Sequence, residues 1–196
     1  KALVYDYLIR LGKDVGDPGD IPAGMLPDEA AEDAYNRFYK SPLPLPDKGR
    51  KAFHIRGKLL RPGAIRITRG VIPVESILKE AKKRNVSLTT LLVAVYIDAL
   101  QELQDTYVSR NPKKRPVAVQ VPVNMRSIYP SKTLRNFSLF VIPEIDPRLG
   151  KYSFDEILQI VRETLITQTN EKAISRYLAR NVGGQRNWLV RIIPLF

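Results

Sequence analysis

The stretch from Ser87 to Leu103 constrains the fold more than any other part of this sequence. Its apolar side chains repeat at helical spacing on one stripe and then continue nearly all round: Leu88, Leu91, Leu92, Val95, Ala99, Leu103, with Val93, Ala94, Tyr96 and Ile97. A helix that is apolar on almost every side is typical of a buried position. We therefore expect a core built around this helix.

Strand-like segments surround that helix. The run Arg115–Val123 is rich in β-branched residues, and Pro122 within it favours an edge strand. Phe137–Ile142 reads as a second strand, separated from the first by a polar loop over 127–135. Phe53–Leu60 and Ala64–Val71 are predicted to be two further strands.

Helical signals flank the strands. Pro73 is expected to open a helix that Asn85 ends. Ser153 and Glu156 match a capping box, which predicts a long helix continuing to about Leu178. We expect Gly183-Gly184 to break that helix. Strands mixed with helices predict an α/β fold.

Composition excludes several chemistries. The chain has no cysteine and a single histidine, which rules out disulfides, thiolate sites and a Cys nucleophile and disfavours zinc. The net charge of +12 is compatible with nucleic acid, anionic membranes or phosphate-bearing ligands, or with a plain basic surface. The charges are dispersed, so we expect no nucleic-acid partner. No apolar run approaches the roughly 20 residues of a membrane span, and the composition fits a cytoplasmic protein.

Few residues offer catalytic chemistry by pattern alone. The carboxylate pairs Glu32-Asp33 and Asp155-Glu156 are sequence neighbours, so neither pair converges naturally on one substrate bond. His54 lies in a strand-like stretch without a Ser, Cys or Asp constellation, so we expect a structural or surface role. No metal site is expected.

Polar residues at the ends of the two apolar strands are the binding candidates. Asn124 and Arg126 follow the first strand, and Asn136 and Ser138 begin the second. Such residues can line a ligand channel, or they can anchor the loop by bonding to backbone carbonyls. The sequence alone leaves both readings open.

Four segments together resemble the CoA-dependent acyltransferase superfamily, which includes chloramphenicol acetyltransferase and the condensation domains of peptide synthetases. The likeness is nearest to bacterial alcohol-acetyltransferase-like proteins. The segments are Glu32–Tyr39, Ser87–Ala94, Val121–Arg126 and Thr133–Phe137, in that order along the chain.

The resemblance implies a sandwich of sheet and helices with two similar subdomains and a tunnel between them. Residues 1–40 would be the end of the first subdomain, 41–48 a Pro-rich linker, and 49–196 most of the second. Asn124, Arg126, Asn136 and Ser138 would lie at the tunnel wall. The family's catalytic His-x-x-x-Asp motif would precede residue 1, so we expect a fragment, incomplete at both ends and inactive alone.

The resemblance further implies an acyl thioester as donor and a small alcohol or amine as acceptor. Acyl-CoA is the expected co-substrate, with no tightly bound cofactor, although an acylated carrier protein is an alternative because the family's Asp-Phe-Gly-Trp-Gly motif is not found. A companion chain or a second copy could supply the missing subdomain. The rival hypothesis is a non-catalytic scaffold or binding protein of the same fold.

Overall fold

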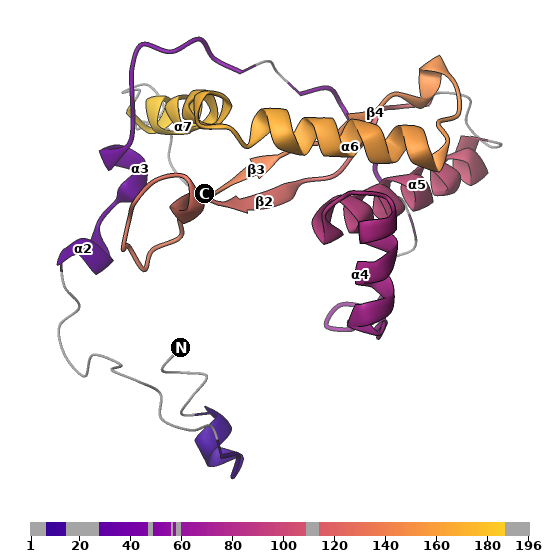
Figure 1. Ribbon diagram of the computed structural model, residues 1–196, viewed down its shortest axis with the longest axis horizontal. Helices are drawn as coiled ribbons and strands as arrows, with labels where there is room; N and C mark the ends of the chain where they lie inside the picture. The colour runs from indigo at the N-terminus through magenta and orange to yellow at the C-terminus, as the bar shows by residue number, and fades with distance from the viewer. Residues whose placement is uncertain are drawn as a thin grey trace.

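The computed structural model describes residues 7–14, 28–46, 49–55, 57, 60–108 and 114–186. The fold is mixed α/β, as the sequence predicted, with small antiparallel sheets (Figure 1). The elements in chain order are α2 Asp28–Ala31, α3 Ala34–Arg37, α4 Val74–Lys83, α5 Leu88–Val108, β1 Val117–Ala118, β2 Val121–Asn124, η1 Met125–Ser127, β3 Ser138–Val141, β4 Glu144–Ile145, η2 Pro147–Leu149, α6 Phe154–Gln168 and α7 Glu171–Arg186.

The strands form two short antiparallel ladders that follow one another along the same two segments of the chain. β1 pairs antiparallel with β4, and β2 pairs antiparallel with β3. Between the two ladders, the Val119 amide still donates to the carbonyl of Pro143 at 3.2 Å. Pro143 has no N–H to return the bond. The predicted strand 115–123 is therefore corrected to two short strands, and the predicted neighbour at 137–142 is confirmed as β3.

A first core forms where α5 crosses α6 and the β1–β4 ladder. Ala94 and Ile97 on α5 pack with Ile157 and Val161 on α6, and all four side chains are fully buried. Ser153 and Glu156 form the predicted capping box at the start of α6. Local capping thus sets where α6 begins, and its apolar face then packs on α5 (Figure 1).

A second core lies at the β2–β3 ladder. Phe137 and Leu139 contact Leu178 on α7 and Ala34 on α3, and the ring of Tyr35 stands edge-on to Phe137 at 5.1 Å. Residues of the Asp28–Tyr39 stretch, which forms the two short helices α2 and α3, are thereby held against the β2–β3 hairpin.

The two strands predicted over 53–60 and 64–71 are not found among the described residues. The described parts of this stretch, including all of 64–71, form neither helix nor strand. Ile65, Ile67 and Val71 are each more than 80% exposed. This segment alternates apolar and polar residues, but it has no neighbouring strand to pair with among the described residues. The prediction was wrong because a strand forms only where its backbone hydrogen-bonds to a neighbour, whatever its residue propensities.

Two helix predictions also need correction. Gly183-Gly184 does not break a helix but lies inside α7, while the break falls earlier, at Thr169 and Asn170 between α6 and α7. α5 is less deeply buried than its composition suggests, since Leu92, Val95 and Tyr96 are 46–54% exposed. Asn85 does end the α4 region with a positive φ of 53°, as predicted.

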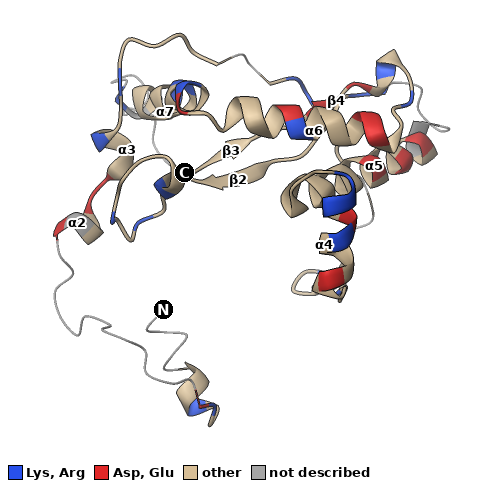
Figure 2. Ribbon diagram, viewed as in Figure 1, with Lys and Arg blue, Asp and Glu red and all other residues tan. Residues whose placement is uncertain are grey.

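Two further parts of the chain lie outside these elements, residues 7–14 and the proline-rich connector. Residues 7–10 are helical, and Gly12 turns the chain with φ of 68°; residues 1–6 and 15–27 lie outside the described parts. Pro44 and Leu45 accept hydrogen bonds from Arg176 through their carbonyls, at 3.0 and 2.8 Å, so the connector is held on α7. Lys and Arg are spread over most elements (Figure 2).

Candidate functional site

The predicted binding residues come together at the closed end of the β2–β3 hairpin. Asn124 is the last residue of β2 and lies opposite Ser138, the first residue of β3. Arg126 lies in η1, directly after β2, and Asn136 lies two residues before Ser138. Antiparallel pairing therefore gathers residues that the sequence separates by a long loop.

Asn124 organises the turn that leaves β2. Its side-chain oxygen accepts from the Arg126 amide at 3.1 Å and caps η1. Its carbonyl accepts from the Ser127 hydroxyl at 2.7 Å. Asn at a helix N-cap satisfies an amide that has no partner inside the helix. This cap explains why the chain turns away from the strand at this residue.

Arg126 is the anchor of the loop. Its Nε and Nη2 donate to the carbonyl of Thr133 at 3.0 and 2.6 Å, and Nη2 also donates to the carbonyl of Arg135 at 2.6 Å. The planar fork of an arginine suits such convergent donation. Of the two readings left open by the sequence, this structure shows the carbonyl-anchoring geometry directly.

Asn136 and Ser138 are joined to each other. The Ser138 hydroxyl donates to the Asn136 side-chain oxygen at 2.8 Å. Asn136 is exposed and Ser138 is half-buried. Both therefore face partly open space at the hairpin end, within reach of a ligand approaching from solvent.

Two residues that were not singled out support this end of the hairpin. The Tyr35 hydroxyl donates to the Ser138 carbonyl at 2.6 Å and accepts from the Ser138 amide at 3.0 Å. The buried Thr133 donates from its hydroxyl to the Glu32 carbonyl at 2.7 Å. Both lie in segments that carry the family resemblance, but their partners are about a hundred positions away, so spacing could not reveal the contacts.

Asp33 is the titratable group most affected near this end. The side-chain amide of Asn36 donates to it at 2.6 Å and, with the backbone amides of Tyr35 and Asn36, holds the pKa of the carboxyl below its usual range. The group therefore serves as the N-cap of α3 in its charged form. It is a structural acceptor rather than a proton donor.

His54 has no catalytic setting among the described residues. It is exposed on an extended segment, next to Phe53, whose amide donates to the Pro116 carbonyl at 2.7 Å. Within the parts of the chain that the structure describes, no group of three or more His, Asp or Glu side chains is placed to hold a metal ion.

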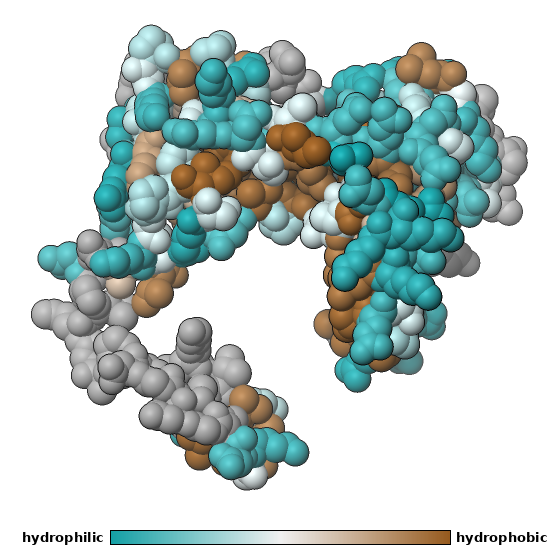
Figure 3. All heavy atoms as spheres, viewed as in Figure 1, coloured by the Kyte–Doolittle hydropathy of each residue, from teal (hydrophilic) through white to brown (hydrophobic). Residues whose placement is uncertain are grey.

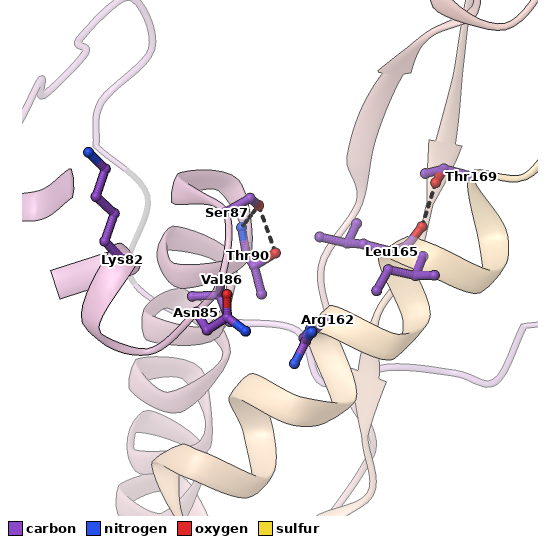
Figure 4. Close-up of a pocket in the computed structure, with 9 residues that line it drawn as sticks. Lys82, Asn85, Val86, Ser87, Thr90, Arg162, Leu165 and Thr169 are labelled. Atoms are coloured by element: carbon purple, nitrogen blue, oxygen red, sulfur yellow. Dashed lines mark hydrogen bonds between the residues drawn. The ribbon is translucent and has the colours of Figure 1, made fainter. Parts of the chain in front are cut away.

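A separate cavity of about 520 Å³ lies between the α4–α5 corner and α6 (Figure 4). None of the four hairpin residues lines it. The residues around it come from three helices and the turn between two of them: Lys82, Asn85, Val86, Ser87, Thr90, Arg162, Leu165, Ile166 and Thr169. Sequence patterns did not indicate this cavity, because it depends on how α6 crosses the corner.

The side chains that line the cavity can form hydrogen bonds and ion pairs with a ligand, but they lack the usual acid–base groups of an enzyme. It offers hydroxyl, amide, ammonium and guanidinium groups, and no carboxylate or imidazole. General acid–base catalysis near neutral pH relies mostly on histidine or a carboxyl group. The cavity is therefore suited to holding a ligand.

Comparisons with known proteins find no matching family model, no matching curated protein and no matching solved structure. Among the described residues, no single helix is long and apolar enough to cross a membrane; α4 and α5 pass such a test only as a pair, bent by 89°.

Proposed function

We propose that this chain is part of an acyltransferase of the CoA-dependent superfamily and that its β2–β3 hairpin lies along the path of the acyl donor. The protein would move an acyl group from a CoA thioester, or a carrier-protein thioester, to a small alcohol or amine. The chain would form most of the second subdomain of that sandwich fold.

The support comes from the outward face of the hairpin. Pro122 pairs with Phe140, and Asn124 pairs with Ser138 one step further along. Residues two apart on a strand share a face, so these four form one strip, apolar at one end and polar at the other. Phe140 is 49% exposed. Such a strip is complementary to an acyl chain ending in a polar thioester.

The reaction itself would need a base that the described residues of this chain do not place at the hairpin. In the family that the sequence resembles, a histidine takes the proton from the acceptor hydroxyl or amine. The acceptor then attacks the thioester carbonyl, and the CoA thiolate leaves. This chain would contribute the wall that orients the thioester, with Asn136 and Ser138 nearest to it.

A second candidate is a non-catalytic scaffold of the same fold. The observation that favours it is the use of Arg126, whose Nε and Nη2 already donate to the loop carbonyls of Thr133 and Arg135. A site whose polar groups mostly satisfy one another has fewer left for substrate. Acyl transfer by the longer protein distinguishes the two candidates.

Exposed apolar side chains on α5 support a companion surface. Leu92, Val95 and Tyr96 follow one another at helical spacing on the side away from the first core. Figure 3 shows further apolar surface along α4, where Val74 and Leu78 are exposed. Large exposed apolar side chains that gather on one helix face are typical of an interaction site. We propose that a companion subdomain or a second copy covers it.

The test measures release of free CoA from acyl-CoA in the presence of alcohols and amines. The chain alone should release none above background, whereas a longer protein that carries this sequence together with a His-x-x-x-Asp motif should turn over. In that protein, Phe140→Glu should raise the KM for long acyl-CoA by about tenfold, because a charge replaces apolar contact area.

Leu149→Glu is the matched control, since Leu149 is 82% exposed and lies outside the hairpin. It should leave KM unchanged. Turnover by the chain alone, or an equal effect of both variants, would contradict this assignment. No turnover by the longer protein with any thioester would favour the scaffold.

A further inference from the structure

The cavity between the α4–α5 corner and α6 is built from parts of the chain about eighty positions apart. Lys82, Asn85 and Ser87 lie at the corner, and Arg162 and Leu165 lie on α6. Figure 4 shows the corner and α6 standing apart, with Leu165 directed toward Ser87 and Thr90 across the opening. The volume of about 520 Å³ lies within the range of small-molecule sites.

The charge of this cavity is positive. Lys82 and Arg162 are its charged lining residues, and neither forms an ion pair within the described parts of the chain. Figure 4 shows the Lys82 ammonium directed away from α6 and Arg162, so Arg162 is the cation beside the opening. A guanidinium without a carboxylate in ion-pair contact favours an anion.

The hydroxyls at the start of α5 add to that preference. The Thr90 amide donates to the Ser87 Oγ at 3.0 Å, and the two hydroxyls share a hydrogen bond of 2.8 Å. Ser87 thus precedes the first turn of a helix of 21 residues. The positive end of that helix dipole therefore lies at the corner that borders the cavity.

Three lining residues are apolar: Val86, Leu165 and Ile166. Val86 and Leu165 pack beside the first core, and Ile166 on the rim is 62% exposed. Binding a ligand whose apolar part covers this exposed side chain would remove apolar surface from water, which is favourable in free energy. The cavity therefore combines an anionic preference with an apolar wall.

We propose that this cavity binds a small amphipathic anion, a carboxylate or phosphate monoester carrying a short apolar chain. Arg162 holds the anionic head, and Leu165 and Ile166 contact the chain. The site is independent of the proposed acyltransferase function, because it shares no residue with the hairpin.

The experiment is calorimetric titration of the chain with octyl phosphate, octanoate, octanol and inorganic phosphate, below the concentrations at which the probes aggregate. Octyl phosphate or octanoate should bind with a Kd of about 1 mM or tighter. Octanol, without charge, and inorganic phosphate, without the chain, should each bind at least about tenfold more weakly, as expected for losing one charge-assisted contact or the buried methylenes. The tighter of the two anions identifies the preferred head group.

Variants locate the site. Arg162→Gln should weaken octyl phosphate by at least about tenfold, and Ile166→Ser should weaken octyl phosphate without affecting inorganic phosphate. The control Arg61→Gln removes the same charge from an exposed position outside the cavity and should bind as the unchanged chain does.

Three results would overturn the proposal: no binding of either amphipathic anion, octanol binding as tightly as octyl phosphate, or an equal loss in the control. Far-ultraviolet circular dichroism of each variant shows whether the fold is kept. If Arg162→Gln unfolds the chain, Ile166→Ser supplies the same decision, since Ile166 is already mostly exposed.

Discussion

Arg126 holds the backbone carbonyl of Thr133 with two nitrogens, Nε at 3.0 Å and Nη2 at 2.6 Å. This pairing closes the loop between β2 and β3. Replacing Arg126 with Lys keeps the charge but removes the fork, so it should not restore the anchor. We expect Arg126→Lys to cost about 1 kcal/mol of unfolding free energy.

Urea unfolding measures that cost. Hydrogen exchange should be faster at the Met125 amide, which donates across the loop to the Phe137 carbonyl, and at the Leu134 amide, which ties the loop to the Ala30 carbonyl. Lys151→Arg is a control at an exposed position. If the Arg126→Lys loop exchanges at the original rate, the carbonyl contacts do not hold it.

Gln101 links α5 to the start of α6 through the backbone of Tyr152. Its amide donates to the Tyr152 carbonyl at 2.9 Å and accepts from the Tyr152 amide at 3.0 Å, and the side chain is fully buried. Gln101→Met should cost about 2 kcal/mol or more, because it leaves two backbone groups unpaired. Denaturant unfolding tests this, with exposed Gln159→Met as the control. If Gln101→Met lowers the unfolding free energy by less than the control does, the hydrogen bonds to Tyr152 do not stabilise the fold.

Asp146 should make stability depend on pH in the acid range. Hydrogen bonds from Arg148, at 2.6 and 2.7 Å, hold the pKa of its carboxyl far below the usual value, with Arg50 adding at 2.6 Å. A carboxyl whose folded pKa is depressed stabilises the fold above its unfolded pKa, about 3.9, and loses that contribution as pH falls through the folded value.

Asp146→Asn should therefore lower the unfolding free energy most near neutral pH, and the difference from the unchanged chain should shrink toward about pH 2. Thermal melts across that range measure it. Asp155→Asn serves as a comparison, because the Asp155 side chain is 83% exposed and its pair with Arg84 should contribute little. A difference that stays constant with pH would refute the assignment.

Gly184 lies inside α7 with open space around the position of a side chain. Gly184→Ala should stabilise the chain by about 0.5–1 kcal/mol, because alanine loses less backbone entropy in a helix. Gly150→Ala should destabilise it, since Gly150 has φ of 134°. Thermal unfolding of both variants gives the two signs. A destabilised Gly184→Ala would mean that α7 ends earlier.

His54 should be dispensable for acyl transfer. It is exposed on an extended segment, away from the hairpin residues in sequence and from the cavity lining. In the longer protein, His54→Ala should leave kcat within about tenfold, since removal of a true general base costs about 10²–10⁴. A thousandfold loss with an unchanged fold would identify a different catalytic site.

Local rules determined what the sequence could predict by itself. The capping box at Ser153, the end of the α4 region at Asn85 and the helix around Leu91 each depend on residues within a few positions. The gathering of Asn124 and Ser138 was also predictable, because two apolar strands joined by one loop tend to pair.

Only the tertiary structure decided the rest. Ile65 and Ile67 alternate like a strand yet lack a partner, whereas Gly183-Gly184 stays helical where α7 packs through Leu178 and Val182. The anchoring of Thr133 by Arg126 and the cavity beside Arg162 both depend on contacts between distant segments. A hydrogen bond or packing contact between distant segments contributes about as much free energy as the local propensity of a residue. Whether a segment becomes a strand or a helix therefore depends on how the elements are arranged as well as on its own sequence.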